Sequence, residues 1–269
     1  MIKTLTPTIA MDFNQLTLLA NTLTDHEYVG YIFHKLFDNP DAKFQKIDHY
    51  DTWKYPKCWH ARYWLNYVYH GYTLKDASIL DLGANLNFYS AWCLANGARS
   101  VHAVEGDATR HQLGKEYISL RNLENSCTTQ LSTINEFIKS YNGEKYDVVF
   151  LQDVLYYLNN HVEILSFIKN VIKPKYFFLE STVVDDVSDN GHLKIWYPSV
   201  DTKNMQSVIE NNKKPLGMIP SRLALRRMIE HTDWNIISYY DYKDFVGHGE
   251  SPPRKAGMKD YYLLGNNHF

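Results

Sequence analysis

The sequence predicts an α/β protein built on a mostly parallel, seven-stranded β-sheet. From Ser78 onward, short β-rich runs alternate with stretches of helical periodicity, which is typical of β-α-β units. The last two β-rich runs lie close together in the chain and are joined by a loop that contains glycine and proline. This arrangement predicts an antiparallel pair of strands at one edge of the sheet.

The individual elements follow from this alternation. We predict strands at residues 78–82, 101–105, 128–131, 146–152, 175–181, 234–240 and 260–264. We predict helices at residues 88–96, 110–120, 134–139, 162–172 and 221–231. Pro174 is expected to end the fourth of these helices, because a proline cannot continue a helix.

The first part of the chain differs from the rest. Leu16, Leu19 and Leu23 recur at helical spacing, and no β-α alternation accompanies them. The sequence therefore predicts two parts, an N-terminal helical extension over residues 1–72 and an α/β domain over residues 73–269.

Composition and charge exclude several classes of protein. Lys+Arg number 28 against 30 Asp+Glu, whereas a nonspecific nucleic-acid binder usually has a clear basic excess. The longest apolar runs, 148–151 and 176–179, are too short to cross a bilayer, and the N-terminus lacks the features of a secretory signal. The cysteines are widely spaced, without a C-x-x-C pair. We therefore expect a cytoplasmic protein with no membrane segment and no metal site.

The run I-L-D-L-G-A-N at residues 79–85 has the features of a ligand-binding loop between a strand and a helix. Asp81 is placed to bind an ammonium group directly or through water, and Gly83 lets a ligand approach the backbone closely. Asn85 stands where a second glycine often occurs, and asparagine tolerates the left-handed conformation well. The helix that follows offers free N–H groups at its start.

Glu105 gives this loop its specificity. It ends the next strand, 22 positions beyond Gly83, where an acid is placed to hold the ribose hydroxyls of an adenosine. An NAD site is the alternative, but NAD requires a G-x-G-x-x-G loop to admit its pyrophosphate. Here the later glycine positions are occupied by Asn85 and Phe88. We expect Ala84 and Gly106, which lie beside these residues, to contact the cofactor as well.

Residues 79–89 followed by 101–107 resemble the class I S-adenosylmethionine-dependent methyltransferases, in their D-x-G-x-N-x-G-F-Y-S variant. Asn87 replaces the last glycine of that motif. The resemblance implies S-adenosylmethionine (SAM) as cofactor and a Rossmann-like fold with helices on both faces of the sheet. It also implies the strand order 3-2-1-4-5-7-6.

Further segments are similar to one branch of this family, the enzymes that complete 5-carboxymethoxyuridine at the tRNA wobble position. These are V-L-Y at 154–156, I-P-S at 219–221 with A-L at 224–225, and the runs D-T-W at 51–53 and K-C-W at 57–59. The resemblance covers residues 50 to 269 and implies cofactor contacts at Trp53, Lys57, Gly83, Glu105, Thr133, Ile134, Gln152 and Tyr156.

One position departs from that branch. Its members use a carboxylated SAM and place an arginine just before the last strand, to pair with the extra carboxylate. Here the position holds Lys259 and Asp260, and an aspartate facing a carboxylate would repel it, whereas an arginine would form a bidentate pair. The sequence therefore favours plain SAM, with the carboxylated form as the alternative donor.

The methyl acceptor is expected beside the residues that follow the fourth strand. Tyr156 is the candidate for lining the methyl site, and Asp153 is a candidate general base. His161 is a further catalytic candidate, with the alternative of an ordinary residue at a helix start. Candidates for substrate binding are Tyr157, Trp196, Tyr197 and Arg222.

Several functions stay open at this point. The leading one is methylation of a small molecule or a nucleoside, and the second is modification of tRNA. Arg222, Arg226 and Arg227 would meet RNA phosphates in the second case, although a solvated helix face explains them equally. A catalytically silent binding protein on the same fold and an NAD oxidoreductase complete the set.

Overall fold

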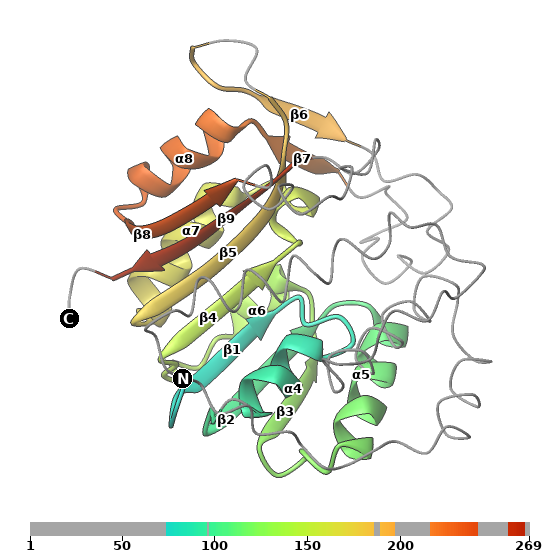
Figure 1. Ribbon diagram of the computed structural model, residues 1–269. Helices are drawn as coiled ribbons and strands as arrows, with labels where there is room; N and C mark the ends of the chain where they lie inside the picture. The colour runs from blue at the N-terminus through green and yellow to red at the C-terminus, as the bar shows by residue number, and fades with distance from the viewer. Residues whose placement is uncertain (1–73, 96, 186–188, 197–215, 242–257, 267–269) are drawn as a thin grey trace, which may run out of the picture.

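The structure of the protein, a computed structural model, describes residues 74–95, 97–185, 189–196, 216–241 and 258–266 (Figure 1). The predicted N-terminal extension therefore lies outside the described residues. Within the described ranges, no helix is long and apolar enough to span a membrane.

The core of the domain is a seven-stranded sheet with the order β3-β2-β1-β4-β5-β9-β8. The pairs among β1 to β5 are parallel, whereas β9 runs antiparallel to both β5 and β8. Numbered within this sheet alone, the order is 3-2-1-4-5-7-6, so the predicted fold class and topology are confirmed. The strands are β1 (Ser78–Leu82), β2 (Ser100–Glu105), β3 (Cys127–Leu131), β4 (Val148–Gln152), β5 (Tyr176–Val183), β8 (Asn235–Asp241) and β9 (Met258–Gly265).

Helices cover the two faces of the sheet (Figure 1). Buried residues of α4 (Phe88–Ala95) and α5 (Ala108–Leu120) belong to one hydrophobic core. Those of α6 (Ile134–Ser140), α7 (His161–Phe167) and α8 (Arg222–His231) belong to a second core on the opposite face. The central strands β1 and β4 are buried along their whole length between the two helical layers, as central parallel strands usually are.

The predicted helix over residues 162–172 is divided in the structure. α7 continues as the π-helical turn η3 (Ile168–Ile172), which ends at Lys173 in the left-handed conformation, with φ at 56°. Pro174 follows directly, so it stops the helix as predicted.

A small second sheet was not predicted. β6 (Leu193–Trp196) and β7 (Gly217–Pro220) pair antiparallel where the sequence indicated only a loop and the approach to a helix. Leu193 and Ile195 of β6 are 42% and 58% exposed, so this strand lacks the buried face that gives a strand its recognisable pattern.

Ser221 joins this small sheet to α8. Its fully buried hydroxyl accepts hydrogen bonds from the N–H of Ala224, in the first turn of α8, and from the N–H of His192. Its own N–H donates to the carbonyl of His192. The I-P-S segment thus forms the start of α8, as its motif predicted.

We expect Ser221→Ala to destabilise the protein by about 1–2 kcal/mol, because it removes a helix cap and leaves the partly buried N–H groups of His192 and Ala224 without this acceptor. Ser140→Ala is the matched control, since Ser140 is exposed and should change the free energy of unfolding by less than about 0.5 kcal/mol. Urea denaturation of both variants measures the difference, and equal stability of the two would contradict this role.

Candidate active site

Polar side chains gather at the carboxyl ends of β1, β2, β4 and β5. The residues two positions earlier on each strand lie in the core under α4 and α5. Because side chains alternate along a strand, these polar residues face the same side of the sheet. They are Asp81, Glu105, Gln152 and Glu180, and each is at most 9% exposed. In open α/β sheets this edge is where ligands bind.

The loop after β1 is held in a left-handed conformation. Gly83, Asn85 and Asn87 have φ angles of 78°, 51° and 59°. The N–H groups of Gly83 and Ala84 both donate to the carbonyl of Val104, at 2.8 and 2.9 Å, which anchors the loop to β2. The predicted left-handed conformation of Asn85 is thus confirmed.

Gly83 is required here for a second reason. A Cβ on this residue would overlap with Cγ2 of Val154, in the segment that follows β4. The loop therefore approaches its neighbour more closely than any residue with a side chain allows.

Glu105 connects the loop to helix α5. Its Oε2 accepts the N–H of Asn85 at 2.7 Å, and its Oε1 accepts the N–H of Asp107 at 2.8 Å. Asp107 in turn caps α5, because its Oδ1 accepts the N–H of Arg110. Burial raises the pKa of Glu105, and these backbone hydrogen bonds oppose the shift. A carboxylate has about four lone-pair sites, so two remain for the hydroxyls of a ligand.

Asp81 lies deeper than the sequence suggested. It is 2% exposed, and its Oδ2 accepts a hydrogen bond from the hydroxyl of Ser90 at 2.7 Å. Burial raises the pKa of Asp81 to about 6, and the Ser90 hydrogen bond partly offsets the rise. Ser90 was not predicted, although its place on the first turns of the helix after the loop was a usable signal.

Gln152 ends β4 with an unsatisfied amide. The side chain is 6% exposed, and neither Oε1 nor Nε2 has a hydrogen-bond partner within the described part of the chain. An unpaired buried polar group costs about 1–3 kcal/mol. A polar ligand at this edge would remove that cost, which is the feature expected of a binding residue.

The segment after Gln152 brings the candidate catalytic side chains together. Asp153 adopts a left-handed conformation, with φ at 57°, and its Oδ1 accepts a hydrogen bond from the hydroxyl of Thr182 at 3.5 Å. Tyr156 and Tyr157 lie in the short helical turn η2 (Leu155–Tyr157), with ring centroids 4.2 Å apart. Thr182 was not predicted, because its role depends on β5 lying beside β4.

Tyr156 is buried, and its hydroxyl lies near Asp153, Tyr157 and Thr182. Burial is the main cause that holds the pKa of Tyr156 well above its usual range, with Asp153 as the next largest. The phenol is therefore protonated at neutral pH and acts as a hydrogen-bonding group.

His161 has a structural contact. It is 3% exposed, and its Nε2 lies 2.9 Å from the carbonyl oxygen of Leu158. Burial lowers the pKa of His161, so the neutral ring ties η2 to the first turn of α7. This geometry favours the alternative that the sequence left open, a residue at a helix start.

Thr133 and Ile134 follow β3 and start α6. Thr133 forms a capping box with Glu136, and Ile134 is buried in the core beneath α6. A Cβ on Gly106 would lie 3.4 Å from the Cα of Thr133, so the loops after β2 and β3 are in contact. Thr133 thus borders the loop that carries Glu105, whereas the side chain of Ile134 is in the core.

Arg222 and Asp260 form an ion pair on the other side of the sheet. Asp260 is fully buried on β9, and its Oδ1 lies 3.4 Å from Nε of Arg222 on α8. The next residue of β9, Tyr261, belongs to the core under α4 and α5, so Asp260 faces α8. The expectation that Asp260 faces the cofactor therefore has to be corrected, because alternation along β9 turns it away.

The two other arginines of α8 also have partners in the chain. Nε of Arg226 lies 3.1 Å from Oε1 of Glu230. Arg227 donates to the carbonyls of Asn190 and Asp189, at 2.7 and 3.0 Å. Of the remaining predicted residues, Trp196 lies in β6, and Trp53, Lys57 and Tyr197 lie outside the described residues.

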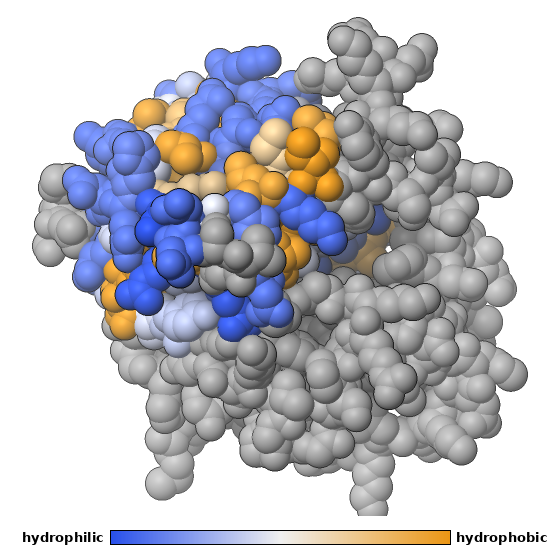
Figure 2. Space-filling model, turned by 90° about the horizontal axis from the view of Figure 1, so that it is seen from above, coloured by the Kyte–Doolittle hydropathy of each residue, from blue (hydrophilic) through white to orange (hydrophobic). Residues whose placement is uncertain are grey.

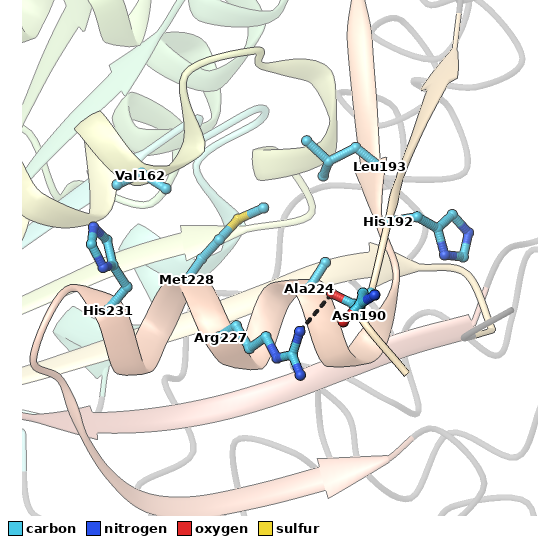
Figure 3. A pocket seen from close by; sticks show the side chains of 9 residues that line it. Val162, Asn190, His192, Leu193, Ala224, Arg227, Met228 and His231 are labelled. Carbon is cyan, nitrogen blue, oxygen red and sulfur yellow. Dashed lines mark hydrogen bonds between the residues drawn. The ribbon is translucent and has the colours of Figure 1, made fainter. Parts of the chain in front are cut away.

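A shallow cavity of about 300 Å³ lies apart from this edge, between α7, α8 and the start of β6 (Figure 3). Arg227 reaches across it to Asn190, and Met228, Leu193 and Val162 give it an apolar lining.

Viewed from above, hydrophobic side chains lie in small groups among hydrophilic ones (Figure 2). Among the described residues, no group of three or more His, Cys, Asp or Glu side chains is placed to hold a metal ion.

Comparison with known proteins supports the fold. No family model and no curated protein matches the sequence. The structure is similar to the N-terminal domain of EvdMO1 with SAH bound, with a TM-score of 0.53, 12% identity and coverage of 77% of this chain and 79% of that one. It is also similar to a SAM-dependent methyltransferase from Leishmania major, with a TM-score of 0.51, 12% identity and coverage of 74% and 68%.

A third similar structure is an S-adenosylmethionine-dependent methyltransferase from Mesorhizobium loti, with a TM-score of 0.51, 9% identity and coverage of 72% and 92%. At these identities the likeness concerns the fold. The α/β domain of this chain has the fold of the S-adenosylmethionine-dependent methyltransferases.

Proposed function

We propose that the protein is a SAM-dependent methyltransferase that transfers a methyl group to an oxygen or nitrogen atom of a small-molecule or nucleoside acceptor. The observation that carries this proposal is Glu105, a buried acid fixed by two backbone N–H groups beside the left-handed loop at Gly83. In a sheet with this strand order, an acid beside such a loop is suited to bind the ribose hydroxyls of an adenosine.

The charges around the loop favour SAM over NAD. SAM carries a positive sulfonium and an ammonium group, and the loop follows Asp81 of β1 and donates a hydrogen bond to the carboxylate of Glu105. The pyrophosphate of NAD is an anion and would be repelled by the carboxylate of Asp81. The later glycine positions of a pyrophosphate loop hold Asn85 and Phe88 here, and the side chain of Asn87 lies close against Gly114 of α5.

We assign the cofactor contacts to the residues around this loop, which are Asp81, Gly83, Ala84, Asn85, Glu105, Gly106, Thr133, Ile134 and Gln152. Trp53 and Lys57 complete the set by their resemblance alone. When bound, SAM supplies a methyl group attached to a positively charged sulfur. The sulfur is the leaving group and keeps the electron pair of the broken carbon–sulfur bond. Methyl transfer then depends mainly on how the protein positions the acceptor.

Asp153 is our candidate for the general base. Thr182 donates to one of its oxygens, which orients the carboxylate at the end of β4. An acceptor hydroxyl or ring N–H loses its proton to this carboxylate as the new bond to carbon forms. The ring of Tyr156 lies beside Asp153, and its hydroxyl donates a hydrogen bond. Tyr157 lies against it and would contact the acceptor.

Modification of a tRNA wobble uridine, with the carboxylated donor, remains the alternative. The V-L-Y and I-P-S segments support it, since they occupy η2 and the start of α8. The engagement of Arg222, Arg226 and Arg227 with partners in the chain weakens it. A silent binding protein on this fold is the non-enzymatic alternative.

The first test is calorimetry with SAM, its carboxylated analogue and NAD, on the wild type and on Gly83→Ala. We expect SAM to bind, and Gly83→Ala to weaken binding by about tenfold or more, because a displaced loop misplaces its contacts. Gly143→Ala is the matched control, since Gly143 also has positive φ, at 88°, but a Cβ on it would have no neighbour within 4 Å. No binding of either sulfonium compound to the wild type would refute the proposal.

We also expect SAM binding to weaken as the pH falls through about 6, where the carboxylate of Asp81 takes up a proton. A cation binds the ionised form better, so protonation removes part of the attraction. Calorimetric titrations from pH 5 to 8 measure this, and Asp81→Asn should remove the step near pH 6. A step of the same size in Asp81→Asn would show that another group causes it.

The acceptor class is identified by measuring transfer of a labelled methyl group from SAM. The panel of acceptors contains nucleosides, hydroxylated and amine metabolites, and bulk tRNA. We expect Asp153→Asn to lower kcat by about a hundredfold or more on the identified acceptor, with unchanged SAM affinity. Asp76→Asn is the control, because Asp76 has a similar φ of 62° but precedes β1, at the opposite end of the sheet. Transfer to tRNA alone would favour the wobble-uridine alternative, and an unaffected kcat would exclude Asp153 as the base.

A further inference from the structure

Helix α5 touches the loop after β1 through a glycine. A Cβ on Gly114 would lie 2.7 Å from Nδ2 and 3.1 Å from Cγ of Asn87, and 3.0 Å from the carbonyl oxygen of Asn85. Real Cβ contacts are almost never as short as the first of these. A side chain at this position would therefore force the helix and the loop apart.

The loop has little room to yield. Asn87 is 2% exposed, and both asparagines already adopt the left-handed conformation. On its other side the loop is tied to Glu105 through the N–H of Asn85. The loop is thus held between Gly114 on one side and Glu105 on the other.

The helix cannot move away freely either. The N–H of Asp107, the cap of α5, donates to the second oxygen of Glu105. Movement of α5 would pull on the same carboxylate that orients the loop. The contacts therefore form a closed ring. The loop meets α5 at Gly114, the cap of α5 is bonded to Glu105, and Glu105 is bonded back to the loop at Asn85.

A glycine within a helix is otherwise unfavourable. Gly114 lies inside α5, where glycine costs about 1 kcal/mol relative to alanine. Gly114 is buried, and its close approach to Asn85 and Asn87 explains why a glycine occupies this position in the helix.

We propose that Gly114 is a positioning residue for the cofactor loop. It touches no ligand itself, but its missing side chain lets α5 press the Asn85–Asn87 segment against Glu105. The inference rests on SAM as the ligand of this loop.

The test is Gly114→Ala, with calorimetry of SAM binding and thermal unfolding on the same protein. We expect the dissociation constant to rise by about tenfold to a hundredfold, as is typical when contacts are misplaced by about an ångström. In a methyl-transfer assay, KM for SAM should rise more than kcat falls. Lys115→Ala is the control on the same helix, because Lys115 is exposed, and its affinity should equal that of the wild type.

A purely structural role would change unfolding and leave the affinity of the folded protein unaltered, and that result would overturn the proposal. Failure of the wild type to bind SAM would instead contradict the cofactor assignment, so the two failures are distinguishable.

Asn87→Gly provides the second, independent measurement, since it keeps the left-handed conformation and removes the atoms that meet Gly114 most closely. In this background Gly114→Ala should fold and should weaken SAM binding much less than it does alone, because the two positions are coupled. The same loss of affinity in both backgrounds would refute direct contact as the cause.

Discussion

The arrangement of the candidate site depends on one carboxylate. Glu105 accepts the N–H of Asn85 with one oxygen and the N–H of Asp107 with the other. It thereby fixes the loop after β1 relative to the start of α5, although it belongs to neither. Because Glu105 is only 9% exposed, its hydrogen bond to Asp107 is buried and that to Asn85 is partly buried, which strengthens both.

Alternation along the strands separates the polar residues into two sets. Asp81, Glu105 and Gln152 face α4 and α5, whereas the pair formed by Arg222 and Asp260 lies under α8. The first set meets at the edge where the strands end and has capacity left for a ligand. The second set is neutralised within the chain, so it contributes to packing and has little influence on a ligand at that edge.

The sequence predicted the fold in detail, because its local signals agree with the tertiary structure. β1 has the predicted bounds, and Pro174 stops the segment before β5. The β6 and β7 pair was missed, since Leu193 and Ile195 are exposed and give no buried pattern. The placement of Asp260 was misjudged, because its face depends on the register of β9 against β5.

What the sequence by itself determined is the class of the domain and the loop at Gly83 that is its candidate cofactor site, since both depend on residues near one another in the chain. Only the tertiary structure decided which side chains meet there. Thr182 donates a hydrogen bond to Asp153, and Gly114 lies against Asn87, because strand order and helix packing bring distant segments into contact. Such contacts leave no periodicity and no motif of fixed spacing in a single sequence, so only the folded structure shows them.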